Sequence, residues 1–81
     1  SKIATKQIEN LRNTDFASLP GSGNFADSDL SQLPQGTATR TITDYQPPST
    51  EIKDVLITVA WVENDAPKQV QMETLIYKNG L

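Results

Sequence analysis

The stretch VLITVAWV, residues 55–62, is followed after a short gap by KQVQMETLIY, residues 68–77. Both runs are rich in the β-branched, aliphatic and aromatic side chains that favour strands. The residues between them, ENDAP at 63–67, are polar turn formers. The two runs therefore predict an antiparallel hairpin with a five-residue connection.

Successive side chains of a strand point to opposite faces of a sheet. One face of the predicted hairpin carries an apolar set that we expect to form the core beneath the helix: Val55, Ile57, Val59, Trp61, Val70, Met72, Thr74 and Ile76. Trp61 is in phase with this set, which favours burial over an exposed ring for ligand stacking. The opposite face carries a second apolar set, too apolar for the whole face to be exposed to solvent: Leu56, Ala60, Val62, Leu75 and Tyr77.

Residues 2–13 predict a helix, because four apolar side chains fall on one helical stripe: Ile3, Ala4, Ile8 and Leu11. The stripe is already running at Ile3 without a capping pattern before it, so we expect a helix that begins uncapped and is truncated on its N-terminal side. About two to three helical turns are unstable alone in water. We therefore expect Ile8 and Leu11 to pack against the sheet face that carries Val55.

Residues 15–36 are rich in Ser, Gly, Asp and Pro and predict a long loop, itself a candidate functional surface. Scattered apolar residues are expected to anchor it at the edge of the core: Phe16, Leu19, Phe25, Leu30 and Leu33. Residues 33–36 predict a tight turn. The threonine-rich run at 37–45 predicts an edge strand, which Pro47 and Pro48 end. The sequence thus predicts one α+β domain over residues 1–81, with the end of a helix (1–14) packed on a small three-stranded antiparallel sheet (37–77).

Composition narrows the classes of function. The chain has no cysteine for a disulfide or thiolate metal site, and no histidine, the usual general base near neutral pH. These features favour a non-enzymatic protein without a cofactor. The net charge of −3 has the wrong sign for a protein that neutralises phosphates. Nucleic acid is therefore not expected as the main partner.

The charge is unevenly distributed along the chain. Residues 1–13 carry Lys2, Lys6 and Arg12 against Glu9, a net charge of +2, which leaves −5 for the rest. An ordinary solvated helix face is the simpler interpretation. The functional interpretation is a complementary contact with a neighbouring copy or partner.

Three further motifs have a possible chemical role that the rest of the sequence does not support. Asp27 and Asp29 resemble the start of an oxygen-ligand set for calcium, but no complete calcium loop follows, so solvated loop acids are favoured. The GSG triplet at 21–23 has no following lysine, which favours a flexible turn over a phosphate loop. Serines such as Ser18 and Ser22 have no histidine partner for nucleophilic catalysis.

Several short motifs, taken in order, carry a family resemblance. They are Ile8-Glu9-x-Leu11-Arg12, Phe16-x-x-Leu19, Leu33-Pro34-x-Gly36-Thr37-Ala38, Val55-x-Ile57-Thr58-Val59-x-Trp61 and Val70-x-Met72-x-Thr74-Leu75-Ile76. Together they span nearly the whole chain. In this combination the chain resembles minor type IV pilins and the minor pseudopilins of type II secretion.

The resemblance implies a pilin-like fold and a non-catalytic structural subunit that packs with homologous subunits. In that family a hydrophobic, N-methylated helix anchors the subunit in the inner membrane, with the domain in the periplasm or, within a filament, at the cell surface. We expect that helix to precede residue 1, and we expect the isolated domain to be monomeric. The candidate interface residues are Lys2, Lys6, Arg12, Leu56, Leu75 and Tyr77.

A second class of function stays open. The chain is also compatible with a free-standing secreted β-rich module, such as an adhesin or inhibitor domain. Its ligand would then be recognised by the Leu56, Leu75 and Tyr77 face or by the long loop. The presence or absence of an apolar run of about 20 residues encoded before residue 1 separates the two classes.

Overall fold

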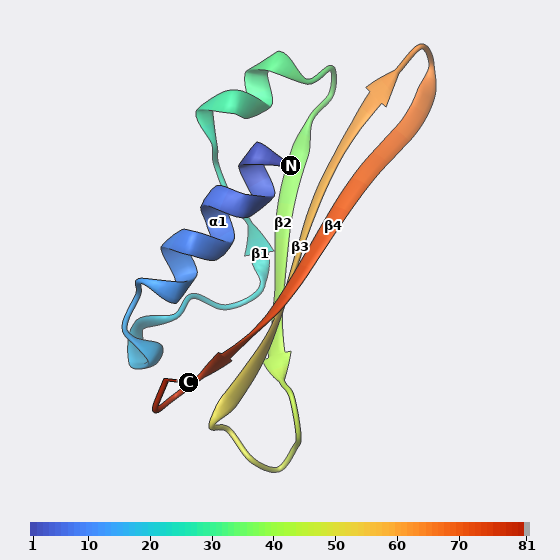
Figure 1. The fold of residues 1–81 in the computed structure, drawn as a ribbon. Helices are drawn as coiled ribbons and strands as arrows, with labels where there is room; N and C mark the ends of the chain where they lie inside the picture. The colour runs from blue at the N-terminus through green and yellow to red at the C-terminus, as the bar shows by residue number, and fades with distance from the viewer. Residues whose placement is uncertain (81) are drawn as a thin grey trace.

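The computed structural model describes residues 1–80 and places one α-helix on one face of an antiparallel sheet (Figure 1). The elements are α1 (Lys2–Arg12), the short 3₁₀ helix η1 (Phe16–Ser18), β1 (Gly23–Asn24), η2 (Ser28–Gln32), β2 (Thr37–Asp44), β3 (Ile52–Glu63) and β4 (Ala66–Tyr77). The strand order is β1-β2-β3-β4. The predicted α+β class is confirmed, but within the described residues the sheet has four strands and not the three predicted.

The β3–β4 hairpin is tighter than predicted. Its turn consists of Asn64 and Asp65 alone, with φ angles of 53° and 65°. Two residues at positive φ make a turn whose twist matches that of the strands, and Asn and Asp tolerate this conformation better than most residues. The strands therefore continue to Glu63 and restart at Ala66, and Pro67 lies within β4 opposite Val62.

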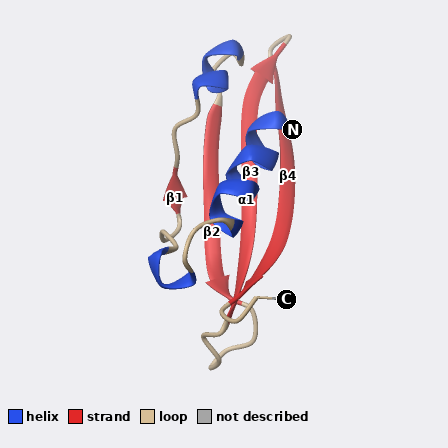
Figure 2. Cartoon of the chain, turned by 60° about the vertical axis from the view of Figure 1, so that its left-hand side comes forward, coloured by secondary structure: helices blue, strands red, loops and turns tan. Residues whose placement is uncertain are grey.

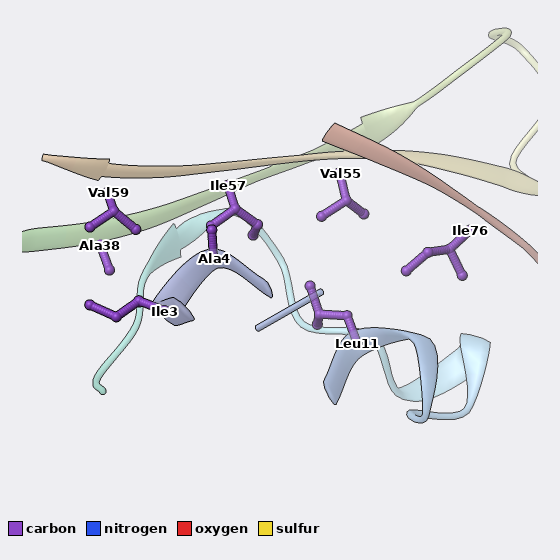
Figure 3. Packing of buried hydrophobic residues seen from close by; sticks show 8 residues of the cluster. All are labelled: Ile3, Ala4, Leu11, Ala38, Val55, Ile57, Val59 and Ile76. Atoms are coloured by element: carbon purple, nitrogen blue, oxygen red, sulfur yellow. The ribbon is translucent and has the colours of Figure 1, made fainter. Parts of the chain in front are cut away.

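The core lies between α1 and the inner face of β2, β3 and β4 (Figure 3). As predicted, the odd-numbered residues of β3 face the helix, and Val55, Ile57 and Val59 are fully buried. Ile3, Ala4 and Leu11 of α1 are buried against them, while Ile8 is half-buried. Figure 2 shows α1 in front of β3, running along the strands. The predicted docking of the helix on the sheet is thus confirmed.

The first turn of α1 corrects one prediction. The backbone N–H of Ala4 donates to Ser1 Oγ at 3.3 Å, so the helix has a side-chain cap. Serine is a favoured cap because its hydroxyl satisfies an N–H group that has no partner inside the helix. At the other end the Asn13 N–H donates to the Glu9 carbonyl, and the helix ends one residue earlier than predicted.

The segment 15–36 is more ordered than the predicted loop. It contains η1, β1 and η2, and its apolar residues pack against the core as predicted: Phe16, Leu19, Phe25, Leu30 and Leu33. The tight turn at 33–36 is also confirmed, because the Gly36 N–H donates to the Leu33 carbonyl at 3.0 Å. β1 pairs with Thr39 and Arg40 of β2, so β2 is not a simple edge strand.

Candidate functional site

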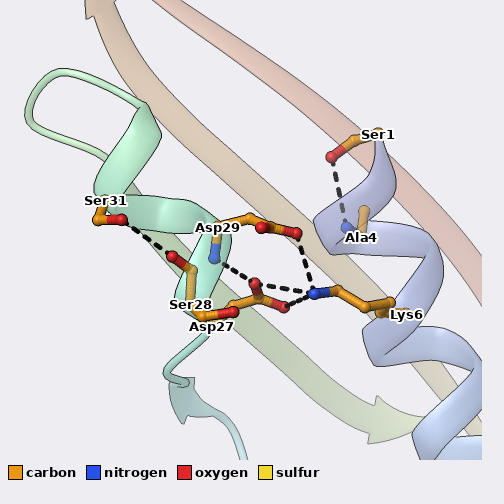
Figure 4. A network of polar contacts seen from close by, with 7 residues as sticks. All are labelled: Ser1, Ala4, Lys6, Asp27, Ser28, Asp29 and Ser31. Atoms are coloured by element: carbon orange, nitrogen blue, oxygen red, sulfur yellow. Dashed lines mark hydrogen bonds and ion pairs between the residues drawn. The ribbon is translucent and has the colours of Figure 1, made fainter.

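The basic residues of α1 were the first predicted contact surface. Lys6 Nζ lies 3.0 Å from Asp27 Oδ2 and 3.1 Å from Asp29 Oδ2, so the helix is tied to η2 (Figure 4). The Asp29 backbone N–H also donates to Asp27 Oδ1 at 2.8 Å. Asp27 therefore caps η2, and Asp27 and Asp29 together hold Lys6. Within residues 1–80, no group of three or more acidic side chains is arranged to hold a metal ion.

These contacts change the protonation equilibria of the groups that make them. Hydrogen bonds to Asp27 and then to Asp29 raise the pKa of Lys6. The Asp29 backbone N–H, followed by the Lys6 ammonium, lowers the pKa of Asp27. Both shifts favour the charged forms, because each charge is stabilised by a hydrogen-bond partner. The ammonium of Lys6 is thus paired within the chain itself.

Arg12 and Lys2 differ from Lys6, because neither of them takes part in an ion pair within the part of the chain that the structure describes. The Arg12 guanidinium donates to Thr74 Oγ1 of β4, which ties the end of the helix to the sheet. Lys2 is exposed and takes part in none of the ion pairs among residues 1–80. Of the three basic candidates, only Lys6 is paired with carboxylates among residues 1–80, so the charges of both Lys2 and Arg12 stay without an acidic partner there.

The outer face of the sheet, away from α1, carries the other candidates. Ile52 lies opposite Tyr77 in the β3–β4 ladder, and Leu75 lies next to them opposite Asp54. With Leu56 they form what we call the outer patch: Ile52, Leu56, Leu75 and Tyr77, all half-buried. The rest of this face is mainly polar, with threonines along β2 and glutamines along β4, apart from Ala60, Val62 and Pro67 near the β3–β4 turn. The predicted apolar residues of the second face thus form two groups, with Leu56, Leu75 and Tyr77 in the outer patch and Ala60 and Val62 close to the β3–β4 turn.

A pair of carboxyl groups within this face was not predicted. Asp54 and Glu73 are diagonal neighbours across β3 and β4. A hydrogen bond shared with Asp54, together with repulsion from its charge, raises the pKa of Glu73. Asp54 Oδ1 is buried and has no hydrogen-bond partner among residues 1–80. A protonated Glu73 can donate to the Asp54 carboxyl group, whereas an ionised Glu73 is repelled by it, and both effects act in the direction of the shift.

Trp61 was predicted to be buried in the core, and this prediction is wrong in its extent. It is in phase with the core residues, yet it is only half-buried. The reason is that β3 and β4 extend past the first turn of α1 toward their connecting turn (Figure 1). A pocket of about 310 Å³ lies there. It is lined by residues of the helix start, of η2 and of the sheet, among them Ile3, Leu33, Val59, Trp61 and Val70.

Comparisons with protein-family models, with curated proteins and with solved structures gave no match. Among the described residues, no helix has the length and apolar character needed to cross a bilayer.

Proposed function

We propose that the chain is a minor pilin or minor pseudopilin, a non-catalytic structural subunit that needs no cofactor. In this proposal it packs with homologous subunits in a type IV pilus or a type II secretion pseudopilus and aids initiation or assembly. The observation that carries the proposal is the placement of α1, whose apolar stripe is buried along an antiparallel sheet. The order of helix, connecting segment and antiparallel strands is the one that the family resemblance implies.

The surfaces available for neighbouring subunits are the exposed basic residues Lys2 and Arg12 and the outer patch. Lys6 is paired with Asp27 and Asp29, so it positions the helix against η2. Arg12 makes one hydrogen bond to Thr74, which positions the end of the helix and leaves its charge exposed. Exposed ion pairs contribute only about 0.2–1 kcal/mol each, so Lys2 would select neighbours without holding them. In this proposal an anchoring helix before residue 1 supplies the strong contacts and places the domain in the periplasm or on the cell surface.

The proposal is tested in a strain whose natural gene carries Lys2→Glu. We expect fewer filaments or less secretion, while the protein still accumulates in the membrane. Lys78→Glu is the matched control, because it makes the same change of charge at an exposed residue after β4 and leaves α1 untouched. Normal assembly after deletion of the whole gene would contradict the proposal.

The pocket beside Trp61 favours the second candidate, a free-standing secreted β-rich binding or adhesin module. A partly exposed tryptophan in the lining of an apolar pocket is a common element of ligand sites. The natural gene decides between the two candidates. An apolar run of about 20 residues continuous with α1 supports the pilin class, and a cleavable signal peptide ending just before residue 1 supports the module.

A further inference from the structure

The edge of the sheet at β2 is closed by the segment that precedes it. β1 pairs with the middle of β2, and the Phe25 N–H donates to the Ala38 carbonyl at 3.0 Å. Ser22 Oγ accepts the Ile42 N–H at 2.8 Å and lies 3.4 Å from the Ile42 carbonyl oxygen, to which it donates. Residues 22–25 therefore satisfy the outward backbone groups along most of this edge.

The other edge, at β4, is open. The two-residue turn makes Glu63 and Ala66 a hydrogen-bonded pair, and such pairs alternate along an antiparallel ladder. Even-numbered residues of β4 thus bond to β3, and odd-numbered residues point their backbone groups outward. Pro67 fits this assignment, because its missing N–H falls on the outward side. Within residues 1–80, no strand or loop bonds to the outward groups of Gln69, Gln71, Glu73 and Leu75.

A row of free donors and acceptors on a regular strand is a template for another strand. β4 pairs with β3 over twelve residues without a bulge, so its outer edge is regular. Because the β2 edge is closed, copies of this chain cannot add to one another indefinitely through their edges. The edge contact that remains uses the same strand on both copies, which requires two-fold symmetry.

We propose that the chain forms a symmetric dimer in which β4 pairs antiparallel with β4 of a second copy. The two four-stranded sheets then join into one continuous sheet. This inference does not depend on the proposed function. It replaces the monomeric state that we expected for the isolated domain from the family resemblance.

The side chains favour the register in which Gln71 lies on the two-fold axis. Gln69 then lies opposite the partner's Glu73, an amide donor beside a carboxylate, and Val70 lies opposite the partner's Met72 on the helix side. Lys68 lies opposite the partner's Thr74, so no two paired strand residues carry like charges, although this threonine also accepts a hydrogen bond from Arg12 of its own chain. An axis at Met72 would instead place Lys68 opposite the partner's Ile76, a charged group against an aliphatic one.

The test uses two variants of the 81-residue chain that add the same charge to the same face of β4. Gln71→Lys places two ammonium groups against each other on the axis, and Gln69→Lys places each new lysine opposite the partner's Glu73. Both residues are exposed, and circular dichroism checks that each variant keeps the fold. Sedimentation equilibrium from about 10 µM to about 1 mM, the range of weak specific complexes, measures association.

We expect the wild-type mass to approach twice the monomer mass within this range. Gln71→Lys should weaken association at least tenfold, whereas Gln69→Lys should keep or strengthen it. Amide exchange of residues 69–75 should slow with concentration in the wild type. Equal effects of the two lysines would overturn the proposed register. A wild-type chain that stays monomeric over this range would overturn the proposed dimer. The open edge at β4 would then be a binding site for an extended segment of another protein.

Discussion

Leu11→Ala tests whether α1 is held by its packing on the sheet. Leu11 is 3% exposed and lies in the core cluster with Val55 and Ile76. The substitution removes three buried carbon atoms, about 2.4 kcal/mol at about 0.8 kcal/mol for each. The cavity left behind increases the loss, so we expect about 3 kcal/mol. A domain of 81 residues has a total stability of roughly 4–12 kcal/mol, so this loss is a large fraction of it.

Urea unfolding, followed by circular dichroism and by Trp61 fluorescence, measures this loss. In a domain of this size, about 3 kcal/mol corresponds to a fall in melting temperature of roughly 12–24 °C. Asn10→Ala is the matched control, because Asn10 is exposed on the same helix and should change stability by less than about 0.5 kcal/mol. Amide exchange in residues 2–12 should become faster in Leu11→Ala than in the control. A loss below about 1 kcal/mol would refute the conclusion that the sheet holds the helix.

Three other substitutions test separate features. Trp61→Ala should destabilise the domain by about 2 kcal/mol, less than the effect at a fully buried tryptophan, and a loss above about 4 kcal/mol in urea would contradict its partly exposed position. Glu73→Gln should stabilise the domain at pH 7, because the raised pKa of Glu73 means that the folded state resists its ionisation. That gain in stability should disappear as the pH falls below 4.5, the ordinary pKa of glutamate. If Glu73→Gln and the wild type unfold at the same urea concentration at both pH 7 and pH 4, the contact with Asp54 is excluded. Asp65→Gly should raise the melting temperature, because glycine relieves a positive φ that costs about 1 kcal/mol in other residues.

The faces of the hairpin were predictable, but its turn was not. Alternation of apolar side chains assigned Val55 and Met72 to one face, and the structure agrees. That assignment itself requires an even number of residues in the turn, because an odd number would bring opposite faces into register. A five-residue connection at 63–67 conflicts with it. Pro67 suggested a break, yet its place on the open edge allows it to stay in the strand.

The remaining differences depend on tertiary contacts. β1 is only two residues long, and neither Gly23 nor Asn24 favours strands, so no propensity predicted it. Lys6 meets Asp27 across a separation of 21 residues, which no local pattern reports. The alternation of side chains along the strand predicted the face of Trp61 correctly. That alternation cannot show how far the helix extends along the strand. The contact between Asp54 and Glu73 could be predicted only from the β3–β4 register, and that register depends on the length of the turn.

The position of α1 in the chain has a consequence for the order of folding. During synthesis α1 is made before the strands that bury it. The contact between Arg12 and Thr74 spans 62 residues. A short helix gains little until that long loop has closed, whereas the β3–β4 hairpin joins residues close in sequence. The hairpin can therefore form early, and α1 is expected to dock late. During synthesis the apolar stripe of α1 stays without its partner until β4 has left the ribosome, which leaves the nascent chain open to aggregation or to a chaperone.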